Sequence, residues 1–211
     1  MCNRYGYQHP YSRLVAEFSD LGPIRWDQLE PNAPRDDIRP TDKAPIIRAA
    51  DGGGVELVER RWGLVPWFHI QRLADFKGLN TNARAETVAA VASFKGPYAR
   101  RRCLVPATHY FEWTENLDNP RSRKLMWKFT VPAQPVFAFP GLWERAQTTD
   151  GPIESFTLLT SAPGRDQAPY HNRQPVILER GQWAEWMDAT NDMAPSFAGS
   201  PPGTIAAERA D

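Results

Sequence analysis

Cysteine is scarce in this chain, which has only Cys2 and Cys103 among its 211 residues. Two thiols cannot supply the dense disulfide framework of small secreted domains. The amino-terminal segment also lacks the apolar run of a secretory signal peptide. We therefore expect a cytoplasmic, reducing environment of the bacterial type, in which both thiols are free.

Long apolar runs and a net charge are missing as well. The sequence nowhere sustains the roughly 20 apolar residues that a bilayer-spanning helix needs, so we expect no membrane span. The 25 basic and 25 acidic side chains cancel at pH 7, so the molecule as a whole has no field that would attract a polyanion. A nucleic-acid site would have to depend on a local cluster of cations, such as Lys95 with Arg100 to Arg102.

Histidine is equally sparse, and the chain has only four: His9, His69, His109 and His171. No two of them are spaced with cysteines in the way that zinc ligands are. We expect neither a metal nor a cofactor.

The apolar pattern favours strands over helices. Alternating or short apolar runs bounded by Pro and Gly predict strands, and helical periodicity is confined to Tyr11 to Phe18, Arg84 to Phe94 and Gln182 to Asp188. Because short turns join most strands, the pattern predicts the α+β class, with a mixed or antiparallel sheet and peripheral helices. The predicted strands are Val55 to Trp62, Cys103 to Trp113, Leu125 to Val131, Val136 to Phe139, Phe156 to Ser161 and Pro175 to Leu178.

The length suits one domain, which we place at residues 1–190. The segment from Asn32 to Pro45 is rich in proline and is interpreted as an extended surface loop. Residues 191–211 contain few large apolar groups, so we expect a disordered tail.

Cys2 draws attention by its position. Removal of Met1, which aminopeptidases favour before a small residue, would expose an amine and a thiol on neighbouring carbons. The reference pKa of the amine is about 7.7 to 8.0 and that of the thiol is about 8.5, so a fraction of the amine is free base at neutral pH. Such a pair can form a Schiff base with an aldehyde and then close a five-membered thiazolidine ring. The alternative is that Cys2 is a small residue next to the initiator, with no role.

Asn82, Arg84 and Glu86 lie at the junction of a loop with a predicted helix. Asn is a favoured helix N-cap and Glu suits the first turn, so capping is one interpretation. The other is that Asn82 forms hydrogen bonds at a reacting centre while Arg84 holds a phosphate.

Glu112 is flanked by Phe111 and Trp113 in a strand-like run. Large aromatic neighbours remove water from a carboxylate, which raises its pKa and suits it to acid–base work. The alternative is a solvent-facing strand residue.

His171 stands in a turn just before an apolar strand, where loops often carry catalytic groups, although such a histidine can also be structural or simply exposed. The aromatic side chains of Trp62, Trp67 and Phe68 could offer a stacking surface to an unpaired base. A second basic cluster, from Arg121 to Lys128, is interpreted as solvated surface.

Several segments together resemble the SRAP (SOS response-associated peptidase) family, whose members shield abasic sites by forming DNA–protein crosslinks. The similar segments occur in the expected order between residue 2 and about residue 188. They are Met1 to Tyr5, Arg39 to Thr41, Arg61 to Trp67, Asn82 to Thr87, Arg102 to Ala107 with Phe111 to Trp113, Gly141 to Glu144, and His171 to Leu178.

The resemblance implies the family's single β-rich, barrel-like domain and a role for each site residue. Cys2 would be the nucleophile, Asn82 a positioning group, Glu112 the proton-shuttling carboxylate and His171 the acid–base that assists sugar-ring opening and crosslink reversal. The expected DNA contacts are Arg4, Trp67, Arg84, Lys95 and Arg173, with Arg84 and Arg173 on phosphates.

The implied partner is single-stranded DNA containing abasic sites, bound by a monomer that associates with the nucleoid. The chain departs from the family pattern at Asn3, where Gly is usual, at Gln174, where Met is common, and at Pro140. Two other functions are kept open: an N-terminal-cysteine hydrolase, with self-processing activity, and a non-catalytic nucleic-acid-binding module.

Overall fold

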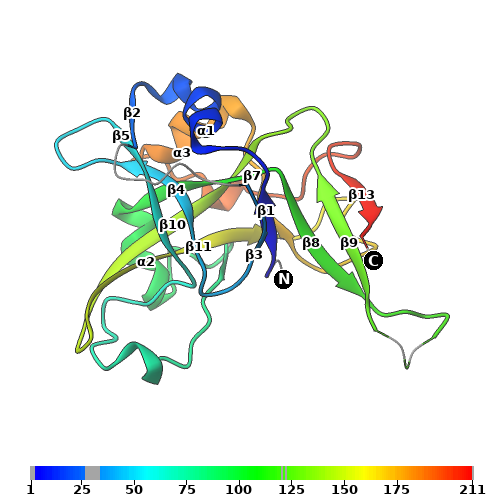
Figure 1. The fold of residues 1–211 in the computed structure, drawn as a ribbon, viewed down its shortest axis with the longest axis horizontal. Coiled ribbons are helices and arrows are strands. Elements are labelled where there is room, and N and C mark those ends of the chain that lie inside the picture. The colour runs from blue at the N-terminus through cyan, green and yellow to red at the C-terminus, as the bar shows by residue number, and fades with distance from the viewer. Residues whose placement is uncertain (1–2, 27–33, 120, 122, 211) are drawn as a thin grey trace.

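Two sheets and a few short helices make up the molecule (Figure 1). The computed structural model describes residues 3–26, 34–119, 121 and 123–210. The first sheet closes on itself, and the second extends from it as a twisted ribbon that ends in a long hairpin.

A barrel of five strands forms the body of the described chain. The strands follow one another in antiparallel pairs in the order β11, β10, β7, β4, β5, and a parallel pairing of β5 with β11 closes the ring. That closure pairs Phe156 with Trp62. Closing a sheet in this way leaves its main strands without open edges. The barrel strands are β4 (Lys43–Ala49), β5 (Val55–Trp62), β7 (Arg102–Ala107), β10 (Phe137–Thr148) and β11 (Gly151–Ser161).

The second sheet has the order β13-β9-β8-β1-β3 and is antiparallel throughout. The chain passes into it from the barrel at Thr108, directly between β7 and β8. Its strands are β1 (Tyr5–Tyr7), β3 (Arg35–Ile38), β8 (His109–Thr114), β9 (Leu125–Thr130) and β13 (Ala206–Arg209).

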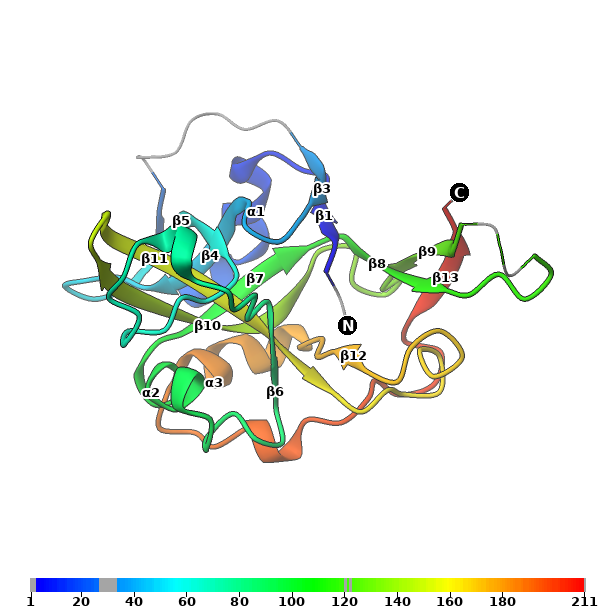
Figure 2. The ribbon, with the colours of Figure 1, turned by 90° about the horizontal axis from the view of Figure 1, so that it is seen from below.

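Short elements cover the barrel. Three strands, β2 (Ile24–Arg25), β6 (Asn82–Arg84) and β12 (Gln174–Pro175), add to its rim, with β6 parallel to β11. The helices are α1 (Tyr11–Glu17), α2 (Ala92–Arg100) and α3 (Trp183–Met187), and the 3₁₀ turns are Ser19–Leu21, Leu73–Asp75, Arg180–Gln182 and Ala194–Ser196. Seen from below, α2 and α3 lie along one side of the barrel (Figure 2).

Two apolar cores result from this arrangement. One lies beneath the helices, where the Phe18 ring stacks on Trp183 at a centroid distance of 4.0 Å. The other joins the barrel to the second sheet through Tyr5, whose ring meets Trp62 edge-on at 4.9 Å. Trp62 is fully buried, so its expected role in a base-stacking surface is wrong and its role is in the core.

The α+β class with a barrel-like mixed sheet and peripheral helices is confirmed. The helix expected over Arg84 to Phe94 is wrong at its start, because Arg84 belongs to β6 and the helix begins at Ala92. The backbone N–H of Ala85 donates to the Thr160 carbonyl at 2.9 Å. Pairing with β11 therefore overrides the helix propensity of this alanine-rich stretch.

The proline-rich segment from Asn32 to Pro45 is also more ordered than expected. Asn32 lies outside the described residues, but β3 and the start of β4 fall within the segment. Ile38 and Ala44 are fully buried, so burial of these two side chains favours strands over a loop.

The chain beyond residue 190 departs from the expected disorder. Residues Ala206–Arg209 form β13, which pairs with β9, and Ile205 is 7% exposed. Met193 and Ala194 are buried as well. A few small and medium apolar groups thus dock this segment, although its composition predicts a tail.

Candidate functional site

The first described residues run alongside Glu112. Strand β1 pairs with β8 so that Tyr5 faces Tyr110, and the Phe111 N–H donates to the Arg4 carbonyl at 2.9 Å. One further step in this antiparallel register brings Asn3 opposite Glu112. Cys2, the residue before Asn3, lies outside the described residues.

The side chain of Asn3 is fastened to the start of β6. Its Oδ1 accepts a hydrogen bond from Thr81 Oγ1 at 2.8 Å and a longer one from Asn82 Nδ2 at 3.3 Å. The Asn82 amide also donates to Thr81 Oγ1 at 3.1 Å. Asn82 is therefore not a helix cap: it lies in β6, beside the start of β1.

Glu112 is buried, with only 3% of its surface exposed. Burial disfavours the charged form and raises the pKa of this carboxyl to about 7. The side chain lies on β8 opposite Trp127 of β9. The expected removal of water and the raised pKa are confirmed, and the alternative of a solvent-facing residue is wrong.

His171 lies in the turn that connects β11 with β12. Burial is the main cause that lowers the pKa of its imidazole, so the ring is mostly neutral at pH 7. The backbone N–H of Arg173 donates to His171 Nδ1 at 2.9 Å. The same nitrogen lies 3.2 Å from the Arg173 carbonyl oxygen, so the backbone of Arg173 holds Nδ1 in either tautomer of the neutral ring.

A chain of contacts joins this turn to β8. Tyr110, two residues from Glu112 on the same face of the strand, donates its hydroxyl proton to Gln167 Oε1 at 2.8 Å. The Gln167 carbonyl accepts the backbone N–H of His171 at 3.2 Å. His171 is thereby linked to β8, the strand that carries Glu112, while Asn82 contacts the amino-terminal segment through Asn3.

Two of the expected DNA contacts are engaged in ion pairs. Arg173 reaches both carboxylate oxygens of Glu86, at 2.7 and 2.9 Å, and also donates to the Thr160 carbonyl. Arg4 binds Asp37 at 2.6 Å, and its guanidinium lies 5.0 Å from the centre of the Phe111 ring. Both side chains are held in fixed positions with much of their charge compensated.

The other expected cations lie at the surface. Arg84 is exposed at the end of β6, and Lys95 is exposed on α2. No hydrogen bond or ion pair within the described ranges joins Lys95 to Asn82, Glu112 or His171. The structure therefore brings Arg84 to the site through β6 and leaves Lys95 without a described link to it.

An exposed aromatic loop lies next to Thr81. Its base is closed by Leu64 and Asn80, whose backbone groups bond at 3.1 Å. Between them Trp67 is 60% exposed and Phe68 is 47% exposed, with their rings edge-to-face at 5.7 Å. Such rings can take an unpaired base on their faces.

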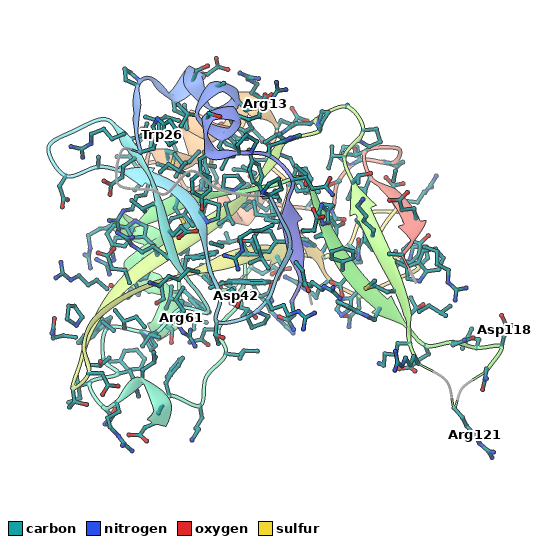
Figure 3. All side chains as sticks on the ribbon, viewed as in Figure 1. Arg13, Trp26, Asp42, Arg61, Asp118 and Arg121 are labelled. Atoms are coloured by element: carbon teal, nitrogen blue, oxygen red, sulfur yellow. The ribbon has the colours of Figure 1, made fainter. Side chains whose placement is uncertain are left out.

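Sequence reasoning missed Asn3, Thr81 and Gln167 as structural partners of the site. The signal for Thr81 was its place directly before Asn82 in a segment already singled out. Gln167 carried no local signal, because its contact with Tyr110 depends on how the turn after β11 folds back. The basic cluster after residue 120 is surface, as expected: Lys124 pairs with Glu115, and Figure 3 shows Arg121 at the far tip of the β8–β9 hairpin.

No group of three potential metal ligands comes together within the part of the chain that the structure describes. Cys103 lies in the core, and burial raises the pKa of its thiol well above the usual range. It is therefore an inert thiol in this fold. Across the described segments, no helix combines the length and apolarity needed to cross a membrane.

Comparisons with known proteins identify relatives of this chain. The family model described as SOS response associated peptidase (SRAP) matches residues 1–202. Abasic site processing protein YoaM of Bacillus subtilis is 30% identical over 195 residues, which cover 90% of this chain and 81% of that protein. YoqW of the same organism, also named an abasic site processing protein, is 32% identical over 196 residues, 90% of this chain and 82% of that protein.

A solved structure shares the fold. The crystal structure of a protein from Bacteroides thetaiotaomicron superposes with a TM-score of 0.84 at 21% sequence identity. The match covers all of this chain and 92% of that one.

Proposed function

Because this chain belongs to the SOS response associated peptidase (SRAP) family, we propose that it binds single-stranded DNA and captures abasic sites as a covalent adduct of Cys2. The relatives YoaM and YoqW are named as abasic site processing proteins. The proposed product is a thiazolidine crosslink that shields the lesion during the response to DNA damage.

One observation carries the proposal: a buried carboxyl with a pKa of about 7 lies beside the first described residues, Asn3 and Arg4. A general base works best when its pKa is near the working pH. At pH 7 about half of Glu112 is ionised and able to take a proton, and the conjugate acid can return one. An ammonium group at Cys2 has a reference pKa within about one unit of this value, so the transfer is nearly balanced.

The proposed reaction begins when Glu112 takes a proton from the Cys2 ammonium. The free amine attacks C1′ of the open abasic sugar, forming a C–N bond and a carbinolamine. Protonation of its hydroxyl lets water leave, and the C=N bond forms. The Cys2 thiolate then adds to the same carbon, forming the C–S bond, and nitrogen keeps one proton in the closed ring. Both nucleophiles belong to one residue, so the second attack is effectively intramolecular.

His171 is proposed to act on the sugar. Its ring is mostly neutral at pH 7, with Nδ1 held by the backbone of Arg173. Nε2 is then the nitrogen that can exchange a proton with the ring oxygen or hydroxyl of the sugar. This step opens the closed sugar to the aldehyde and assists reversal of the crosslink.

Recognition of DNA is proposed to come from stacking and from a few cations. Trp67 and Phe68 offer ring faces to unpaired bases, and the exposed Arg84 side chain would bind a phosphate. Arg4 and Arg173 would act from their ion pairs, as ordered but partly neutralised donors. Lys95 would contact strand outside the lesion.

A denaturing gel tests the function. The protein with Met1 removed is incubated with a single-stranded oligonucleotide that has one abasic site, and then denatured. We expect a heat-stable shifted band that is lost in Cys2→Ala and slowed in Glu112→Gln, whereas His171→Ala chiefly slows ring opening or release. Wild-type rates in both of the last two variants would remove Glu112 and His171 from the mechanism.

The same experiment separates the alternatives. A complex that dissociates on denaturation, without any heat-stable band, would indicate a non-catalytic nucleic-acid-binding module. Amide hydrolysis without any shifted band would indicate an N-terminal-cysteine hydrolase. Mass measurement of the purified chain checks the premise, because a retained Met1 leaves no vicinal amine and thiol to react.

A further inference from the structure

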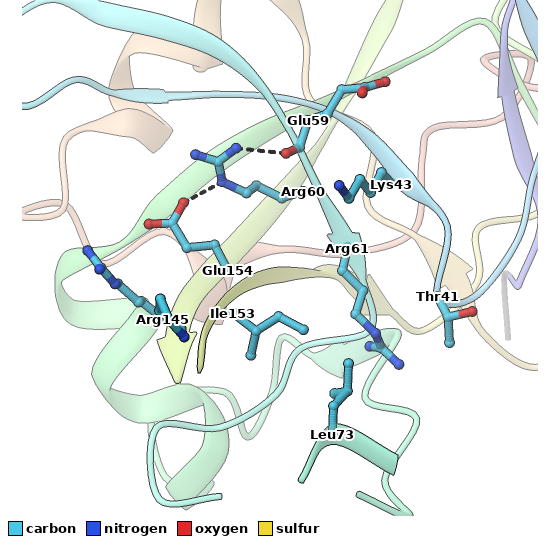
Figure 4. Close-up of a pocket in the computed structure, with 10 residues that line it drawn as sticks. Thr41, Lys43, Glu59, Arg60, Arg61, Leu73, Arg145, Ile153 and Glu154 are labelled. Atoms are coloured by element: carbon cyan, nitrogen blue, oxygen red, sulfur yellow. Dashed lines mark hydrogen bonds and ion pairs between the residues drawn. The ribbon is translucent and has the colours of Figure 1, made fainter. Parts of the chain in front are cut away.

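A second surface feature lies beyond the groups assigned above. A groove of about 810 Å³ runs between the β3–β4 turn, the end of β5 and the β10–β11 hairpin. Its volume lies in the range of about 300–1,000 Å³ that is typical of ligand sites. Four cations line it, Lys43, Arg60, Arg61 and Arg145 (Figure 4). We call this the cationic groove.

The carboxylates of the groove are already engaged. Glu154 accepts hydrogen bonds from both Arg60 and Arg48. Glu59 accepts the Tyr11 hydroxyl at 2.7 Å. Arg48 also pairs with Glu56 at 2.8 Å, so the charges around Glu154 are balanced. The positive excess of the groove comes from its lining as a whole, which has four cations against the two carboxylates Glu59 and Glu154.

The other three cations have no carboxylate partner within the described part of the chain. Lys43 and Arg145 are exposed, and neither is in an ion pair there. Arg61 is half-buried, and its described hydrogen bond is to the Gly63 carbonyl. Burial lowers the pKa of Arg61, because a desolvated guanidinium without a counter-charge is disfavoured. An anion in the groove would supply that counter-charge.

The groove adjoins the candidate site through a short series of contacts. Thr41 on its rim donates its backbone N–H to the Trp62 carbonyl at 2.8 Å. The Trp62 indole donates to the Thr81 carbonyl at 3.0 Å, and Thr81 holds the Asn3 side chain. The Thr41 end of the groove, next to Arg61 in Figure 4, is therefore the end that these contacts link to the amino-terminal segment.

We propose that the cationic groove binds the phosphodiester backbone of the nucleic-acid strand that leaves the lesion site. This inference rests on the proposed function, and it adds a path for the strand. Successive phosphates would meet Arg61, then Lys43 or Arg145. Between these cations Leu73 and Ile153 give apolar surface that suits sugars and base edges. A single small anion would not need this length or these apolar side chains.

Salt-dependent binding of intact DNA tests the groove without the covalent step. The probes are single strands of about 20 and about 5 nucleotides without any lesion. For the double variant Lys43→Gln with Arg145→Gln, we expect about tenfold weaker binding of the long strand at low salt. The slope of log K against log salt should fall in magnitude by about 1.4, since each phosphate contact on a single strand contributes about 0.7. Binding of the short strand should change little.

The control variant is Arg13→Gln with Arg180→Gln, which removes the same charge elsewhere. Figure 3 shows Arg13 near the top of the view, well above Arg61. Equal slopes for the groove variant and this control would overturn the proposal. The proposal would also be overturned if the double variant lost the binding of inorganic pyrophosphate seen with the wild type but bound the long strand as the wild type does. Loss of the covalent band with an intact abasic strand would instead count against the proposed function, since these readouts are independent.

Discussion

Glu112 carries a cost in stability that its proposed role explains. Its folded pKa of about 7 lies above the value of about 4.3 expected for an unfolded chain. Below about pH 4.3 the carboxyl is protonated in both the folded and the unfolded chain, so it costs no stability there. As the pH rises towards 7 the carboxyl ionises in the unfolded chain but stays protonated in the folded one, and the free energy of unfolding falls. Over that window the loss is on the order of 3 kcal/mol.

We predict that Glu112→Gln gains stability relative to wild type between pH 4.5 and pH 8, because glutamine stays neutral. The measurement is the Tm of both proteins across this range, with the exposed Glu185→Gln as a control that should show no such trend. A Tm difference between Glu112→Gln and wild type that does not vary with pH would show that folding does not raise the pKa of Glu112.

Asn3 is the residue that follows the proposed nucleophile, Cys2. Its side chain accepts hydrogen bonds from Thr81 and Asn82, which a glycine could not. We predict that Asn3→Gly and Thr81→Val each slow adduct formation severalfold, and that the double variant is no slower than the worse single one. Their coupling should be about 1 kcal/mol, the typical net value of one hydrogen bond.

The readout for this pair is the rate of the heat-stable band in a double-mutant cycle. Additive effects would mean that Asn3 and Thr81 act separately. Because a loosened amino terminus need not alter global stability, unchanged Tm values alongside slower capture would assign the pair to positioning.

At the scale of elements, β10 depends on close approach to its neighbours at Gly141. A Cβ at this position would lie 2.8 Å from Val105 Cγ2 and 2.9 Å from Cys103 Sγ, both in β7. We predict that Gly141→Ala lowers the free energy of unfolding by about 1–3 kcal/mol, as overpacking usually does. Urea unfolding measures this, with Gly181→Ala as control because nothing lies within 4 Å of its added Cβ. Equal stability of the two variants would show that β7 and β10 can move apart freely.

The sequence predicts elements well where one strand buries one face. Alternation identified β5 and β9 nearly to their ends, and it identified the run that became β7 and β8. It failed where a distant partner decides the conformation. Arg84 lies in β6 because β11 offers a parallel partner, and β1 is only three residues long between β3 and β8.

In the candidate site, too, some features are predictable from the local sequence and others depend on partners that are distant in the sequence. A raised pKa for Glu112 could be expected from the sequence, and burial of the carboxyl in the fold is its main cause. The engagement of Arg173 by Glu86 could not, because 87 residues separate them and only the packing of β6 against β11 brings them together. Exposure of Trp67 and burial of Trp62, five residues apart, likewise depend on where the barrel closes.

At the scale of the whole molecule, two apolar cores share one barrel, and the chain after residue 190 touches both. Tyr98 on α2 donates its hydroxyl proton to Asp192 at 2.6 Å and accepts the Ala194 N–H at 3.0 Å. Met193 is buried in the core beneath the helices, and Ile205 is buried in the core between the sheets. This segment therefore connects the helical side of the molecule to the second sheet.

We predict that ending the chain at residue 190 lowers the Tm by about 10 °C or more. Burial of a side chain such as Met193 or Ile205 contributes about 1.5–3 kcal/mol, and about 1 kcal/mol follows for each lost hydrogen bond. Each kcal/mol shifts the Tm of a chain of this size by about 2–4 °C. A chain ending at residue 202 is the matched comparison, because it keeps Met193 and the Tyr98 contacts and loses only Ile205 and β13. Its Tm should fall between the other two, whereas identical Tm values for all three chains would mean that residues 191–210 are a dispensable tail and that the domain ends at residue 190.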